Sequence, residues 1–160
     1  MAEPISLQEL KEWLRLNSGS FADNFIAVQS IAPGSHAVTV GYTLEGAYAD
    51  VLGYSAVVIL DSGTNGTITG PPLLTGTVDI KIQESDDHIT WIDWTGGAFT
   101  QITTANDNAI YEKAYTGSKQ YIRVVGKVLL AACEFGVQIA KYSSDVTEDT
   151  LLTSIISTAR

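Results

Sequence analysis

The sequence predicts a mainly β protein, an antiparallel β-sandwich or jelly-roll-like domain with a short α-helix at each terminus. In TVDIKIQ (77–83), apolar residues occupy every second position, which is typical of a half-buried strand. Many other short apolar segments lie between Gly, Pro and Asn turn signals with no helical period between them. A helical period is found only in residues 1–18 and 145–160, so the predicted β domain spans 19–144.

The N-terminal segment MAEPISLQELKEWLRLNS carries the signals of a helix start. Pro4 precedes it, Ser6 can cap the free amides, and Glu9 stands three residues later in the capping-box position. Its apolar stripe consists of Leu7, Leu10, Trp13 and Leu14. A helix of about eleven residues is not stable alone, so this stripe is predicted to bind a partner surface.

The predicted strands of the β domain lie between these helices. They are 25–31, 36–42, 54–62, the two halves of a central hairpin (76–94), 99–102, 108–115, 119–131 and 133–142. Gly and Pro crowd the segment 63–76, which we interpret as a mobile loop with Leu73 and Leu74 at an apolar tip. That tip is either a contact site or folds back onto the sandwich.

The central hairpin is predicted to turn tightly at Asp86 and Asp87. This register places Ile82 opposite Trp91, with Ile89 on the same core-facing side as Trp91. Burial of such side chains contributes roughly 1.5 to 3 kcal/mol each, whereas an isolated hairpin is marginal in water. A larger β domain is therefore expected around the hairpin.

The C-terminal segment has a second helical stripe. Asp145 with Glu148, or Thr147 with Thr150, can cap its start. The stripe consists of Leu151, Leu152, Ile155 and Ile156. We expect the two terminal helices to form a helical hairpin, with the β domain inserted in the loop between them.

Composition narrows the possible functions. The 160 residues, 45% of them hydrophobic, suffice for one domain with a core. A net charge of −9 argues against nucleic acid as the main ligand, because phosphate binding needs clustered basic residues. The charged fraction of 17% indicates either surface covered by neighbouring subunits or simply a Gly- and Thr-rich β domain. With no signal-peptide pattern or apolar span, we expect a chain made in a cytoplasm and not inserted in a membrane.

The cysteine, histidines and turn aspartates, which could act as catalysts or metal ligands, are expected to have structural roles. Cys133 lies in an apolar run and is expected to be a buried, inert thiol, and His36 is expected at a strand end. Asp86, Asp87 and His88 could hold a cation, but acidic turns usually cap their own backbone, and the same holds for Asp107. With no catalytic motif in the sequence, we expect no enzyme, no cofactor and no metal.

Aromatic residues offer a possible binding surface. The expected hairpin register places Trp94 on the face away from the core, beside Gly96 and Gly97, where it could stack on a sugar or anchor a protein interface. Alternatively, it packs under the following loop. Trp94, Tyr111 and Tyr115 are the candidate platform of a carbohydrate-binding module.

Two stretches at the termini resemble a known family. ISLQELKEWLRLN and EDTLLTSIISTAR are similar to the first two helices of the head-to-tail connector (adaptor) proteins of tailed bacteriophages. The resemblance implies an oligomer that contacts the phage portal, connector or major capsid protein.

The intervening residues resemble a β domain of phage proteins encoded near the capsid gene. This similarity is carried by YSAVVILDSG, VDIKIQESDDHITWIDW, FTQITTANDNAIYEKAYTGSKQYIRVV and FGVQIAKY. IQESDDHITWIDW also resembles the hairpin of galactose-binding-like modules. The expected function is therefore a non-enzymatic virion protein assembled in the host cytoplasm, of the connector type or head-associated. The alternatives are a capsid decoration protein and a carbohydrate-binding module.

Overall fold

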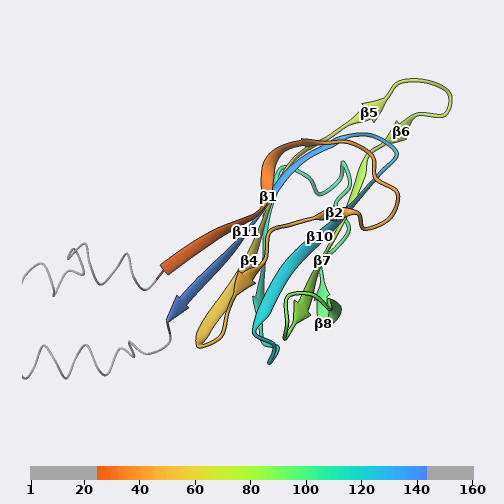
Figure 1. Cartoon of the computed structure of the whole chain (residues 1–160). Coiled ribbons are helices and arrows are strands. Elements are labelled where there is room, and N and C mark those ends of the chain that lie inside the picture. Colours follow the sequence, from red (N-terminus) through yellow and green to blue (C-terminus); the bar gives the residue numbers. More distant parts are fainter. Residues whose placement is uncertain (1–24, 144–160) are drawn as a thin grey trace, which may run out of the picture.

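The computed structural model describes residues 25–143, and this part of the chain is mainly β with antiparallel sheets. The two predicted terminal helices and their apolar stripes lie outside the described residues. Figure 1 shows the strands running along one elongated body. The predicted mainly β, antiparallel class is confirmed for residues 25–143.

Four long strands form one sheet. In spatial order they are β1 (Phe25–His36), β11 (Cys133–Ser143), β4 (Tyr54–Asn65) and β9 (Ala109–Tyr115). All three pairings are antiparallel. Pairing of β1 with β11 joins the two ends of the described chain, because Phe25 lies opposite Tyr142.

The second sheet has five strands. Its path is β2 (Leu44–Glu45), β10 (Tyr121–Leu129), β7 (Thr77–Ser85) and β8 (Ile92–Ala98), and β3 (Ala49–Asp50) also pairs with β10. In β10 and β7 the side chains alternate between core and solvent, as the sequence predicts for β7. Val78, Ile80 and Ile82 are each at most 1% exposed, so their predicted burial is confirmed.

One apolar core lies between the two sheets in a sandwich-like arrangement. It joins β4 and β11 of the first sheet to β7 and β10 of the second. Its largest fully buried side chains include Leu60, Ile139, Ile80, Ile82 and Ile122. The two sheets are therefore parts of one packed unit.

The predicted register of the central hairpin is wrong. Gln83 lies opposite Asp93 and Glu84 lies opposite Ile92, so Ile82 and Trp91 do not face each other. The turn is longer than two residues, because the strand resumes only at Ile92. The extra turn residues carry Ile89 outward, where it is 77% exposed instead of facing the core.

Two of the predicted strands, 36–42 and 99–102, do not form as strands in the described residues. Residues 37–43 form an extended loop tied to β10, since Thr39 N donates to Val128 O and its Oγ1 accepts from Val128 N. Gly41 has a φ of 75°, which interrupts the extended conformation. Residues 99–102 contribute only an isolated bridge between Ile102 and Val78.

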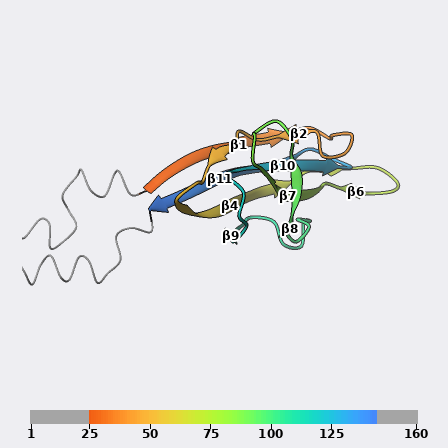
Figure 2. The ribbon, with the colours of Figure 1, turned by 60° about the horizontal axis from the view of Figure 1, so that its bottom comes forward.

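The segment predicted as a mobile loop contains a short ribbon. Strands β5 (Thr67–Ile68) and β6 (Leu74–Thr75) pair with each other as a separate two-stranded sheet. In Figures 1 and 2 this ribbon extends from one end of the body. The described chain begins in β1 and finishes in β11 at the opposite end of the body. We call the ribbon of β5 and β6 the distal ribbon.

Candidate functional site

The described chain begins and finishes at the same end of the body. Phe25, the first described residue, pairs with Tyr142 next to the last one. Residues opposite each other in an antiparallel pair have Cα atoms about 4.5 to 5.5 Å apart. The segments that carry the predicted partner-binding stripes are therefore joined to the β domain at adjacent points (Figure 1).

The opposite end of the body carries no charged side chain in three neighbouring segments. These segments, which we call the uncharged end, are 37–44, 66–76 and 128–133. Hydrogen bonds from Thr39 N to Val128 O and from Gly66 N to Ala132 O hold them together. Its exposed aliphatic side chains are Val38, Val40, Ile68, Leu73 and Leu130. Of the two predicted tip residues, Leu73 is 64% exposed and Leu74 is half-buried.

A cluster of rings lies at one side of the five-stranded sheet. Its members come from three separate segments and are Tyr48, His88, Trp91 and Tyr121, with the guanidinium of Arg123; we call this set the aromatic cluster. The rings of Tyr48 and His88 are stacked, with centroids 5.4 Å apart and planes within 3°. Tyr121 meets both of these rings edge to face.

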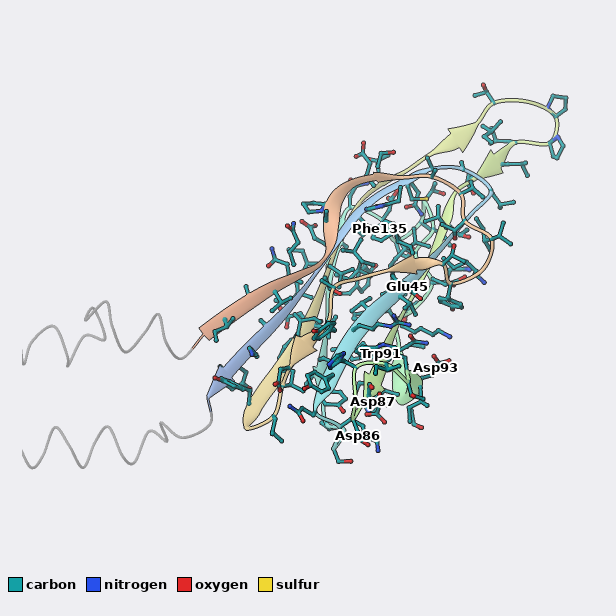
Figure 3. The ribbon with its side chains drawn as sticks, in the orientation of Figure 1. Glu45, Asp86, Asp87, Trp91, Asp93 and Phe135 are labelled. Carbon is teal, nitrogen blue, oxygen red and sulfur yellow. The ribbon has the colours of Figure 1, made fainter. Side chains whose placement is uncertain are left out.

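The guanidinium of Arg123 is fixed by three neighbours. It lies over the Trp91 ring, 4.6 Å from the centroid, and its Nε donates to Gln83 Oε1 at 3.0 Å. Its Nη1 forms an ion pair with Glu45 at 3.2 Å. Figure 3 shows Trp91 and Glu45 along the five-stranded sheet, with Asp86 and Asp87 at the turn below them. One side of the Trp91 ring is thus already occupied by a cation.

Local sequence explains why Tyr48 reaches the cluster. Gly46 N donates to Val124 O and Ala47 N donates to Ser30 O, so the link between β2 and β3 is pinned to strands of both sheets. A Cβ at Gly46 would clash with the Ser30 hydroxyl and with Val124 O. Only glycine permits this close approach, which directs the next residues along the edge of β10.

Asp87 fixes the turn that presents His88 and Trp91. Its Oδ1 accepts hydrogen bonds from Thr90 N at 2.7 Å and from Ile89 N at 2.9 Å, and the Ser85 hydroxyl donates to it as well. These donors hold the pKa of the Asp87 carboxyl far below its ordinary value. The predicted capping role of this acidic turn is confirmed. Within residues 25–143, no group of three His, Cys, Asp or Glu side chains is placed to hold a metal ion.

The three aromatic residues predicted as a platform are not gathered on an open surface. Trp94, Tyr111 and Tyr115 are half-buried and pack against the core. The Trp94 and Tyr115 rings meet edge to face at 5.0 Å, and Tyr115 Oη donates to Glu84 Oε2 at 2.7 Å. Burial and this hydrogen bond raise the pKa of the Tyr115 hydroxyl. These rings close the side of the body where β9 approaches β8.

Sequence reasoning missed most of the aromatic cluster. Trp91 was expected in the core because of the wrong hairpin register, and His88 was considered only as a metal ligand. Tyr48 lies in a short turn-rich segment with no periodic pattern, so no local signal marks it. One local signal was available for Tyr121. It lies two residues before Arg123 on a strand whose alternate residues are buried, so the two side chains lie on the same, outer face of the sheet.

Other predicted residues have structural roles. Cys133 is fully buried, as expected, and burial raises the pKa of its thiol. His36 ends β1 instead of starting the predicted strand 36–42, and its Nε2 lies 3.0 Å from Ala32 O and from Phe135 O. Asp107 Oδ2 accepts a hydrogen bond from Asn65 N of β4 at 2.9 Å, so this carboxylate ties its segment to β4 and does not cap its own backbone as expected.

Comparison of the chain with models of known protein families gave no match, and comparison with curated proteins gave none either. In residues 25–143 there is no helix long and apolar enough to cross a membrane.

Proposed function

We propose that this chain is a non-enzymatic structural protein of a tailed-phage virion. In this proposal the terminal segments form a helical hairpin, and the β-sandwich is inserted between the two helices. The apolar stripes of the hairpin bury against the portal, the connector or the major capsid protein, or against a second copy of the chain. The protein is then a connector-type or head-associated subunit, or a decoration protein on the capsid surface.

The pairing of Phe25 with Tyr142 is the observation that carries this proposal. Two short amphipathic helices are marginal alone, but they bury both stripes if they start side by side. The β domain supplies such a start, because it joins both segments to adjacent strand ends. The β domain then projects from the attachment point as one rigid unit, with its distal ribbon at the opposite end.

The uncharged end also supports a role in assembly. On a chain with a net charge of −9, three adjacent segments with no charged residue leave a surface free of electrostatic repulsion. Interface cores are depleted in charged residues, and this end exposes apolar side chains such as Val40, at 92%, and Leu73, at 64%. Contacts repeated around a ring or lattice would add to one another.

The mass of the full chain in solution tests the proposal. We expect light scattering to show an assembly that grows with protein concentration. The double variant Leu10→Asp with Ile155→Asp should be monomeric, with the far-UV circular dichroism of the β domain retained. Ile110→Asp, at a side chain 66% exposed on the four-stranded sheet, is the matched control and should assemble normally. A monomer at every concentration would contradict the proposal.

A further inference from the structure

We infer that the aromatic cluster is a carbohydrate-binding site, which takes an uncharged pyranose on the exposed faces of Tyr48 and His88. This inference goes beyond the proposed structural function and does not depend on it. It also concerns residues other than Trp94, Tyr111 and Tyr115, the platform that the sequence suggested.

The exposure of the stacked rings is the first argument. Tyr48 remains 49% exposed although it contacts three other rings, and His88 is exposed too. A pyranose presents an apolar C–H face that packs against an aromatic ring, while its hydroxyl groups point to the sides. Since the rings are already fixed by one another, little conformational entropy is lost on binding.

Hydrogen-bonding groups border these rings on β3 and β10. Asp50 lies opposite Tyr121 in the register of the two strands. Gln120 Nε2 donates to Asp50 Oδ2 at 3.1 Å and to Tyr121 Oη at 3.0 Å. The Asp50 carboxylate and Gln120 Oε1 keep lone pairs that these contacts do not use. They can therefore bind neighbouring sugar hydroxyls.

The backbone of His88 has an uncommon conformation. Its φ is 48°, in the left-handed region, where asparagine, aspartate and histidine are the enriched non-glycine residues. A histidine in this conformation costs of order 1 kcal/mol. The visible contacts of the imidazole ring are the stack on Tyr48 and the edge contact with Tyr121.

Charge selects among ligands that stack on aromatic rings. Asp50 and Asp87 lie beside the cluster with no ion-pair partner among residues 25–143 and repel the phosphates of a nucleic acid, whereas Glu45 is paired with Arg123 and Asp86 with Lys119. An uncharged sugar does not meet this repulsion.

The test is a titration of the full chain with methyl β-D-galactopyranoside, methyl β-D-glucopyranoside and N-acetyl-D-glucosamine, followed by NMR. We expect at least one sugar to shift the indole N–H signal of Trp91, assigned with Trp91→Phe, with a millimolar Kd. Tyr48→Ala should weaken this binding by about tenfold. The matched control is Tyr142→Ala, which removes a ring 44% exposed on β11 of the other sheet and should bind as the wild type does.

A second variant separates binding from folding. His88→Gly keeps the backbone conformation and removes only the ring, so its Tm should not fall while its affinity for the sugar does. The inference is overturned if none of the three sugars, at about 50 mM, shifts the Trp91 signal. It is equally overturned if Tyr48→Ala and His88→Gly bind a sugar as tightly as the wild type. The mass of the assembly is a separate readout, so this result and that of the proposed function can be told apart.

Discussion

The outer faces of the two sheets enclose the same core but differ in their chemistry. On the five-stranded sheet, long charged side chains pair across strands, as in Lys81 with Asp93 and Lys127 with Asp79. Tyr42 lies beside both lysines and Trp91 beside Arg123. Within residues 25–143, all four ion pairs belong to this sheet or to the turns at its end.

The outer face of the four-stranded sheet has mostly small or uncharged side chains at the corresponding positions, with Asp61 and Glu112 as charged residues among them. One row across β1, β11, β4 and β9 consists of Ala27, Ala140, Val57 and Ala114, and the next of Gln29, Gln138, Ile59 and Glu112. This face therefore lacks the paired side chains that cover the other one. The difference shows that a single core can support one face covered by ion pairs and one face with smaller side chains.

A substitution in the shared core should destabilise both sheets together. Ile82 is fully buried between the sheets, and Ile82→Ala should lower the free energy of unfolding by about 2 to 5 kcal/mol. Denaturant unfolding of this variant should show one transition by tryptophan fluorescence and by far-UV circular dichroism. Ile110→Ala, at a side chain 66% exposed, should change stability by less than about 0.5 kcal/mol. Two separate transitions would show that the sheets are independent units.

Two matched valines measure how well each outer face is covered. Val125 points away from the main core yet is 1% exposed, whereas Val57 on the other outer face is half-buried. Val125→Ala should cost about 2 kcal/mol, because the overlying side chains exclude water from it, and Val57→Ala less than about 1 kcal/mol. Urea unfolding of both variants measures the difference. Equal costs would mean that the paired side chains do not shield the sheet.

The parts of the fold that the sequence predicted well are those fixed by burial. Val78, Ile80 and Ile82 alternate with polar residues because one face of β7 meets the core, and this requirement is visible locally. The same alternation in HAVTVGY predicted a strand that the structure lacks. There Val38 and Val40 are 52% and 92% exposed, so the alternation was not produced by a core.

The aromatic cluster could not be predicted for a different reason. It depends on the hairpin register, which the Asp87 turn shifts, and on the path of the β2 to β3 link, which Gly46 fixes against Val124. The first is set within the turn, by hydrogen bonds that the Asp87 side chain accepts from residues two and three positions after it, and the second is a tertiary contact between segments far apart in sequence. A residue pattern within one segment carries no information about the second.

Acid should weaken the five-stranded side of the molecule through Asp87. Its pKa is depressed in the folded state, so its contribution is complete above the ordinary carboxyl pKa of 3.8 and is lost as the pH falls through the folded value. Asp87→Asn should therefore lower the urea midpoint at pH 7, and the difference from the wild type should shrink in acid. Asp61→Asn, at an exposed residue on the other outer face, is the control for removal of one carboxylate and should leave the urea midpoint at pH 7 close to that of the wild type. A difference for Asp87→Asn that stays constant down to the lowest pH would contradict this assignment.

The smallest expected effect is the coupling of Lys81 with Asp93. Their 2.7 Å ion pair is largely solvated, since the two side chains are 21% and 57% exposed. A double-mutant cycle with alanine should give a coupling of less than about 1 kcal/mol, and screening in 1 M salt should reduce it further. A cycle between Glu112 and Gln138, which lie on either side of Ile59 on the other outer face, should give no coupling. Equal coupling in the two cycles would remove the electrostatic difference between the faces, leaving only the difference in side-chain size.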